Sequence, residues 1–185
     1  MMNNIWVSSD LHLCHARDFI YGPRGFENVQ EHNETIIKNW NEIVAPDDDV
    51  YLLGDLMLND NEHGMECLGK LNGRLHLIRG NHETDERWKL YPNSKNVVEL
   101  CGWATQLRIS KQSLFLSHYP TITSNCDAEK PLKARVLNLC GHSHTKDPFA
   151  DWDKGLIFHC ELDTNNCKPW NYEDIIKKVK EKLGE

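Results

Sequence analysis

The sequence predicts an α/β protein built on two β-sheets, and two observations support this prediction. In the first half of the chain, short apolar runs alternate with segments of helical periodicity, a pattern typical of parallel strands connected by helices. In the second half, apolar runs follow one another with few helical segments between them, which indicates a second sheet.

The predicted buried strands are apolar runs at residues 5–9, 50–53, 75–79, 114–117 and 136–140. Each has four or five residues, the usual length of a strand inside a sheet. Further strands of the second half are expected at residues 97–100, 103–109 and 156–162. No linker or repeat divides the chain, so we expect residues 1–185 to form a single domain.

Three segments have the periodicity of amphipathic helices. Residues 31–44 place Ile36, Trp40 and Val44 at spacings of four along one face. Residues 62–71 are a shorter candidate. Residues 172–183 carry apolar side chains on one face and lysines and glutamates largely on the other, so we expect this last helix to pack on the outside.

Composition argues against some classes of partner. The chain has 21 Lys and Arg against 28 Asp and Glu, a net charge of −7, so we expect no broad basic surface for extended nucleic acid. Neither a leader segment nor a membrane-spanning stretch is predicted. The seven cysteines are odd in number and have no repeated pair spacing, which favours reduced thiols and a cytoplasmic location.

Residues able to bind metal ions follow five of the predicted strands. These candidate ligands are Asp10 and His12, Asp55, Asn81, His118, and His142 with His144. The crevice beyond the carboxyl ends of strands is where open α/β proteins assemble their sites. Four imidazoles and three oxygen donors converging there could hold two metal ions.

Each of these motifs alone also has a structural explanation. Asp and Asn are common turn residues, which would account for Asp10 and Asp55. Asn81 would also suit the cap of a helix starting at His82, and a lone histidine such as His118 is usually a hydrogen-bonded core residue. The recurrence of such donors after five strands favours metal binding.

The order and spacing of the motifs D-x-H, G-D, G-N-H-E, S-H-Y-P and G-H-x-H, between residues 10 and 144, resembles the calcineurin-like metallophosphoesterase superfamily. The sequence at residues 10–15, 33–41 and 163–170 is similar to a small bacterial and phage branch described only as predicted phosphoesterases. The resemblance implies a four-layer αββα fold, in which two packed mixed β-sheets are flanked by helices.

The resemblance also implies a role for each site residue. The first metal would be held by Asp10, His12, Asp55 and His144, and the second by Asp55, Asn81, His118 and His142. Asp55 would bridge the two ions. His82 would be the catalytic residue, facing the phosphate and the leaving-group oxygen.

Two cations bridged by Asp55 would support direct attack of a shared hydroxide on phosphorus, and His82 could protonate the leaving group. Imidazole and oxygen donors together suit manganese as the expected metal, with iron, zinc, cobalt or nickel as alternatives in a divalent or mixed-valence pair. A zinc ion bound through Cys140 is a rival arrangement, although a buried apolar role explains Cys140 more simply.

The loop after the first strand carries three candidates for binding substrate phosphate. These are His15, Arg17 and Arg24, which would form a rim of the crevice. The alternative is that they are solvated or pair with nearby glutamates. The loop at residues 119–133 is long for a simple connection and is predicted to shape substrate choice.

The predicted function is that of a dinuclear-metal-dependent phosphoesterase acting on phosphomonoesters or phosphodiesters, with a small phosphorylated substrate as partner. A protein Ser/Thr phosphatase is not expected, because Leu58 replaces the Asp that braces the catalytic histidine in that class. One alternative is a nuclease or cyclic-nucleotide phosphodiesterase, for which Trp152 is the candidate stacking residue. Another is a non-catalytic protein-interaction scaffold with the same fold, which the retention of all ligand positions argues against.

Overall fold

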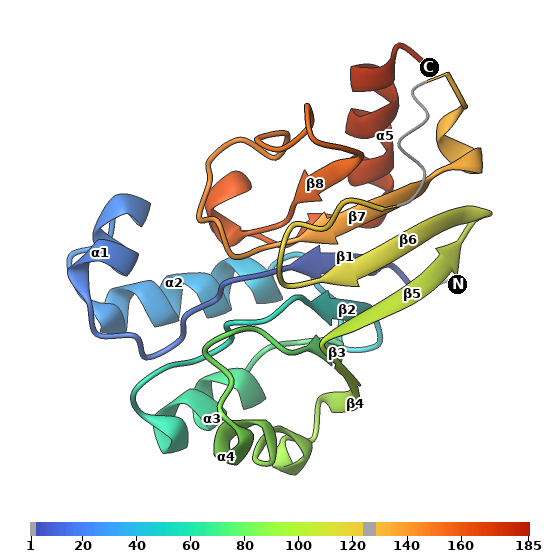
Figure 1. The fold of residues 1–185 in the computed structure, drawn as a ribbon. Coiled ribbons are helices and arrows are strands. Elements are labelled where there is room, and N and C mark those ends of the chain that lie inside the picture. The colour runs from blue at the N-terminus through green and yellow to red at the C-terminus, as the bar shows by residue number, and fades with distance from the viewer. Residues whose placement is uncertain (1–2, 124–128) are drawn as a thin grey trace.

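Nine strands form two mixed sheets in the computed structural model, which describes residues 3–123 and 129–185 (Figure 1). The five-stranded sheet has the order β4-β3-β2-β1-β9, and the four-stranded sheet the order β5-β6-β7-β8. The strands are β1 (Ile5–Ser8), β2 (Asp49–Leu52), β3 (Arg74–Ile78), β4 (Val97–Gly102), β5 (Ala104–Ile109), β6 (Gln112–Ser117), β7 (Val136–Cys140), β8 (Ile157–His159) and β9 (Trp170–Asn171).

Most neighbouring strands run parallel. In the first sheet β1 to β4 are parallel and β9 is antiparallel to β1. In the second sheet β6, β7 and β8 are parallel and β5 is antiparallel to β6. Because parallel strands end at the same edge of a sheet, the loops after β1, β2 and β3 come together, as do those after β6, β7 and β8.

Helices cover the sheets from outside. The helices are α1 (Asp18–Tyr21), α2 (Val29–Asn41), α3 (Asn61–Gly69), α4 (Asp85–Trp88) and α5 (Tyr172–Leu183). In Figure 1, α2 and α3 lie against the five-stranded sheet, and α5 lies on the opposite side of the molecule, next to β7 and β8. This arrangement confirms the four-layer fold that the resemblance implied.

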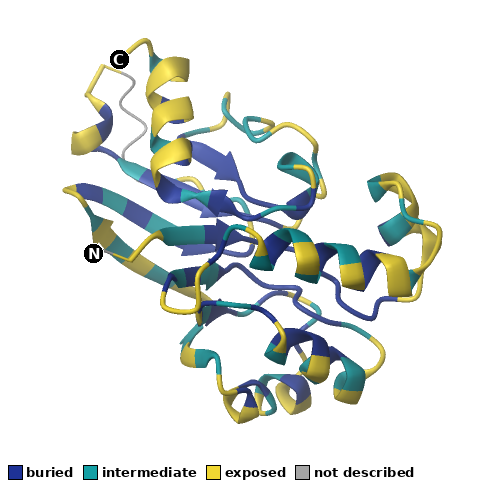
Figure 2. Ribbon diagram, turned by 180° about the vertical axis from the view of Figure 1, so that it is seen from behind, coloured by how far each residue is buried: buried dark blue, intermediate teal, exposed yellow. Residues whose placement is uncertain are grey.

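The two-residue period of β2 divides the core into two clusters. Val50 and Leu52 pack with Ile36 and Trp40 of α2, beneath the five-stranded sheet. Leu53, on the other face, joins a cluster that contains side chains of both sheets and of α5. Figure 2 shows the result: buried residues concentrate in the strands, and the helices turn exposed residues outward.

Capping residues set the helix starts. Asn28 accepts a hydrogen bond from the Glu31 N–H, so α2 begins at Val29, before the predicted residue 31, and it ends at Asn41. The last helix covers residues 172–183 as predicted, because the Asn171 side chain caps its first turn. Among the described residues, no helix is long and apolar enough to cross a membrane.

Two strand predictions were wrong in part. The strand predicted at residues 97–100 was expected in the second sheet, but β4 pairs with β3 and extends the first sheet. The run at residues 156–162 is not one strand, because β8 ends at His159. Beyond it, Glu161 bridges to Ser9, and a 3-10 turn (Leu162–Thr164) carries the chain toward the end of β1.

Candidate metal centre

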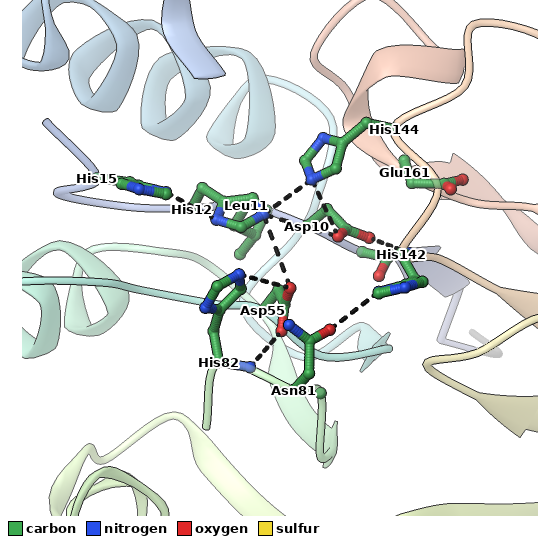
Figure 3. Close-up of polar contacts among 12 residues, drawn as sticks. Asp10, Leu11, His12, His15, Asp55, Asn81, His82, His142, His144 and Glu161 are labelled. Atoms are coloured by element: carbon green, nitrogen blue, oxygen red, sulfur yellow. Dashed lines mark hydrogen bonds and ion pairs between the residues drawn. The ribbon is translucent and has the colours of Figure 1, made fainter. Parts of the chain in front are cut away.

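The loops after five strands bring all seven predicted ligands to one edge of the molecule. Asp10 and His12 follow β1, Asp55 follows β2 and Asn81 follows β3. His118 follows β6, and His142 and His144 follow β7. Figure 3 shows most of these side chains pointing toward one another around Asp55.

Four side chains form a first group of donor atoms. The Nε2 atoms of His12 and His144 lie 3.0 Å apart. Asp10 Oδ1 lies 3.7 Å from His12 Nε2 and 3.5 Å from His144 Nε2. Asp55 Oδ2 completes the group at 3.8 Å from His12 Nε2.

A second group lies on the other side of Asp55. Asn81 Oδ1 is 2.8 Å from His118 Nε2 and 2.9 Å from His142 Nδ1. The two imidazole nitrogens are 3.2 Å apart. Asp55 Oδ2 is 3.5 Å from His118 Nε2, so a single carboxylate oxygen adjoins both groups.

A shared cation explains the positions of these donor atoms better than hydrogen bonds among them do. Ligands bound to one ion at about 2.1 Å lie about 3.0–3.4 Å apart, close to the spacing within each group. The buried Asp10 Oδ1 has no hydrogen-bond partner among the described residues, which is costly unless a positive charge adjoins it. His118 Nδ1 donates to the Leu53 carbonyl, so the Nε2 lone pair faces the group. The residues present therefore fit bound metal ions.

Neutral imidazoles are the form in which histidine binds a metal. Burial, and repulsion from neighbouring imidazoles, lower the pKa of His12 and His142. Burial disfavours charged His144 as well, but its hydrogen bond to Asp163 and the negative charges of Asp10 and Asp163 together outweigh burial and raise its pKa overall. His12 and His142 are therefore easily obtained in the neutral form that binds a metal, whereas the His144 imidazole is hydrogen-bonded to the Asp163 carboxylate.

The backbone is strained at most of the predicted ligands. Left-handed φ angles occur at Asp10 (57°), His12 (50°), Asp55 (54°), His142 (77°) and His144 (48°). Each such residue costs on the order of 1–3 kcal/mol and persists only where the surroundings hold it. Such strain concentrates at functional sites, and here it turns side chains of separate loops toward one point.

Glycine is required at two turns beside these ligands. At Gly54, with φ of 94°, an added Cβ would lie 2.6 Å from Gly80 Cα and 2.7 Å from His118 Nδ1. At Gly141 it would collide with the Ser9 hydroxyl and the Asp10 carboxylate. Both turns pass too close to a ligand to accept a side chain.

Glu83 connects the loop after β2 to the loop after β3. Its buried carboxylate accepts hydrogen bonds from the N–H groups of Asp55 (2.9 Å), Leu56 (2.9 Å) and Gly80 (2.7 Å). The Tyr91 hydroxyl donates to the same carboxylate at 3.1 Å. Glu83 thereby sets the position of Asp55 without pointing into the centre.

Arg24 is buried in an ion pair, whereas the sequence predicted that it binds substrate phosphate. Its side chain is only 1% exposed and makes a forked pair with Asp163 (3.0 and 2.7 Å). It also donates to the Asp10 and Leu11 carbonyl oxygens. Since Asp163 contacts His144, Arg24 links the loop after β1 to a predicted ligand.

Glu161 plays a comparable part beneath the loop after β7. Its buried carboxylate accepts from the N–H of Ser143, which lies between His142 and His144, at 3.0 Å. His159 contacts the same oxygen at 3.1 Å. The sequence predicted no supporting role for Glu83, Glu161 or Asp163, although Glu83 belongs to the G-N-H-E motif and Asp163 to the similar segment at residues 163–170.

A cleft of about 480 Å³ opens over the centre. His15 lines it, and His15 Nδ1 lies 3.2 Å from His12 Nδ1, so His15 orients a ligand. Burial lowers the pKa of His15 to about 4. Arg17 is exposed at the start of α1 and does not line the cleft. A wider hollow of about 820 Å³ elsewhere is lined by no His, Asp or Glu, so we assign it no chemistry.

His82 also lines the cleft, with its side chain 40% exposed and Nε2 3.8 Å from Asp55 Oδ2. Its backbone is held by a hydrogen bond from its N–H to Asp55 Oδ1 (3.0 Å) and by the Arg87 guanidinium, which donates to its carbonyl oxygen. Asp60, the acidic residue that follows Leu58 by two positions, caps α3 by accepting a hydrogen bond from the His63 N–H.

Three alternative interpretations are not supported by the geometry. Asn81 caps no helix, because α4 begins at Asp85 with Thr84 as its cap. Cys140 is fully buried, and burial raises its pKa, so it behaves as a core thiol. Trp152 packs edge-to-face on Phe149 rather than lining the cleft. The loop predicted to shape substrate choice includes residues 124–128, which lie outside the described residues.

The chain is similar to known proteins over most of its length. The model of the calcineurin-like phosphoesterase superfamily domain matches residues 3–159. The chain is 48% identical over 184 residues to "Uncharacterized protein MJ1445" of Methanocaldococcus jannaschii, covering 96% of this chain and 92% of the relative. It is 28% identical over 167 residues to the Gene 66 protein of Mycobacterium phage L5, covering 80% of each.

Solved structures share the fold. The protein of unknown function AQ665 from Aquifex aeolicus superposes with a TM-score of 0.72 at 22% identity, covering 96% of this chain and 100% of that chain. A structure described as a novel archaeal phosphodiesterase superposes with a TM-score of 0.50 at 16% identity, covering 84% and 82%. With the family match over most of the chain, these findings show that the protein is a metallophosphoesterase belonging to the calcineurin-like phosphoesterase superfamily.

Proposed function

We propose that this chain is a dinuclear metal-dependent enzyme that hydrolyses phosphomonoesters or phosphodiesters of small substrates. The observation that carries the proposal is the position of Asp55 Oδ2. It lies 3.8 Å from His12 Nε2 in one donor group and 3.5 Å from His118 Nε2 in the other, as a bridging carboxylate must.

The donor groups suggest the ligands of each ion. The first ion would be held by Asp10, His12, Asp55 and His144, and the second by Asp55, Asn81, His118 and His142. When bound, such a pair of cations activates water for in-line attack on phosphorus and neutralises charge on the phosphoryl oxygens. Manganese stays the expected metal, because the donors are nitrogen and oxygen without sulfur.

The residues around the ions have separable roles. His82, anchored through its backbone and reaching into the cleft, would donate a proton to the leaving-group oxygen. His15 and Asp163 orient His12 and His144 through hydrogen bonds to the ring nitrogen that faces away from the centre.

The cleft favours a small substrate. Its volume of about 480 Å³ is within the range of pockets for small molecules. The net charge of −7 argues against the broad basic surface with which a nuclease tracks a strand. A cytoplasmic location stays a prediction from the cysteines.

Elemental analysis and mutagenesis test the proposal. Protein purified without chelator should carry at least two metal equivalents, and Asp55→Asn should lose both ions of this centre. His82→Asn should keep its metals but lose about 10²–10⁴-fold in turnover of substrates with a basic alkoxide leaving group. The loss should shrink for aryl esters, whose leaving group needs no proton.

Two results would contradict the proposal. A loss of fewer than two metal equivalents per chain from the parent to Asp55→Asn would exclude the shared carboxylate. A metal-loaded parent that hydrolyses neither aryl monoesters, aryl diesters nor short oligonucleotides would instead favour the non-catalytic scaffold.

A further inference from the structure

We propose that Cys14, His63 and Cys67 form a separate binding site for one Zn²⁺ ion, between α3 and the loop that follows β1. This site uses different residues and a different donor chemistry from the centre around Asp55. The inference does not depend on the proposed function.

The three side chains already converge. Their ligand atoms, two sulfurs and one imidazole nitrogen, all lie within 4.8 Å of one another. His63 and Cys67 are four residues apart on α3 and therefore share a face of the helix. Cys14 is brought to that face because its neighbour Leu13 forms a parallel bridge with Met57, just before the helix.

Burial and charge favour a bound dication over free thiolates. Cys14 is 7% and Cys67 2% exposed, in the cluster that also contains Leu68 and Trp40. Two thiolates, a neutral imidazole and Zn²⁺ sum to zero charge, so the loaded site is compatible with apolar surroundings. His63 is only half-buried, which gives an ion a route from solvent and leaves room for water as a fourth ligand.

A buried amide supports one of the sulfurs. Asn33 on α2 accepts a hydrogen bond from the Cys14 N–H at 3.0 Å and donates its Nδ2 to Cys14 Sγ at 3.4 Å. An N–H donor of this kind stabilises a thiolate and is the usual outer partner of a metal ligand. It also holds Cys14 in a left-handed conformation, with φ of 62°.

Two simpler explanations leave part of the arrangement unexplained. Cysteines that only fill the core, or that form a disulfide, have no need of an imidazole on the same helix face. Soft sulfur donors select zinc, whereas the nitrogen and oxygen donors around Asp55 accept manganese. Since Cys14 lies between the cleft residues His12 and His15, an ion here would tie their loop to α3.

Cobalt substitution tests the site by a signal that only sulfur ligands give. In an Asp55→Asn background, which removes the ions of the other centre, one Co²⁺ per chain should bind with thiolate-to-cobalt charge-transfer absorption in the near ultraviolet. Cys14→Ser and Cys67→Ser should abolish this absorption. Cys101→Ser, a half-buried cysteine in β4, is the matched control and should keep it.

His63→Ala covers the case in which the buried cysteine variants do not fold. This side chain is partly exposed on α3, and its loss should weaken Co²⁺ binding by at least about tenfold while the absorption at saturation remains. Folded Asp55→Asn protein that shows no charge-transfer band would overturn the proposal. So would a band unchanged in all three variants, or a Cys14–Cys67 disulfide in protein purified under reducing conditions. None of these outcomes bears on manganese-dependent hydrolysis by the parent.

Discussion

Replacing Glu83 with Gln should weaken both the fold and the metal centre, because this carboxylate accepts three backbone N–H groups and one hydroxyl at 2.7–3.1 Å. An amide has only one acceptor oxygen, and its NH₂ must face N–H donors. The least costly orientation turns the NH₂ toward Tyr91 and Leu56. The amide oxygen would then keep the bonds from Asp55 and Gly80.

The magnitude follows from these bonds. Hydrogen bonds to a charged group contribute about 1.5–3 kcal/mol each and neutral ones about 0.5–1.5 kcal/mol. Two bonds would weaken, and the buried Leu56 N–H would lose its acceptor. Part of the loss is offset because a buried charge no longer has to be desolvated. We expect a net destabilisation of about 2–4 kcal/mol, and about 10–100-fold weaker metal binding because Asp55 is less well held.

Urea unfolding and metal titration measure the two effects on Glu83→Gln. Glu86→Gln is the matched control, because it makes the same change at an exposed position three residues further on. If Glu83→Gln matches this control in both stability and metal affinity, the assignment of Glu83 as the support of Asp55 is wrong.

Three other substitutions have definite expected outcomes. Burial raises the pKa of Asp48, but hydrogen bonds from two backbone N–H groups and the Trp6 indole lower it overall, so Asp48→Asn should cost about 1–3 kcal/mol at neutral pH. A carboxyl group with a depressed pKa loses its contribution on protonation, so urea titrations should show the gap to the parent closing below about pH 4. Arg24→Lys should lower metal affinity about 10–100-fold in titrations, because a single ammonium cannot reproduce the fork to Asp163. Gly141→Ala should lower metal occupancy in elemental analysis, because the added methyl group displaces a ligand carboxylate.

Each of these predictions can fail clearly. A gap between Asp48→Asn and the parent that stays constant into acid would mean that the carboxylate charge contributes nothing. Unchanged metal affinity in Arg24→Lys would show that Asp163 holds His144 without its arginine. Full metal occupancy in Gly141→Ala would mean that the turn relaxes at little cost.

Much of the fold was predictable because its strands and helices carry local patterns. The apolar runs of β1, β2, β3, β6 and β7 were located within one or two residues. The pairing of β4 was not predicted, because a strand beside β3 has the same local sequence pattern as a strand in the other sheet. The bend after His159 was missed because it depends on the bridge from Glu161 to Ser9, far back in the chain.

The candidate ligands were found for a related reason. Asp, Asn and His stand out after apolar runs, so the sequence by itself determined which donors lie at strand ends and in what order. It also determined the α/β class, because periods of two and of about 3.6 residues record which faces are buried.

Only the tertiary structure decided how those donors are held. The His142 N–H donates to Asp10 Oδ2 across 132 residues of sequence, and Arg24 reaches Asp163 across 139. The tertiary structure likewise decided that Cys14 lies beside His63 and Cys67, since no spacing in the chain relates Cys14 to α3. Such contacts depend on the packing of loops from separate strands, which leaves no periodic trace in the sequence.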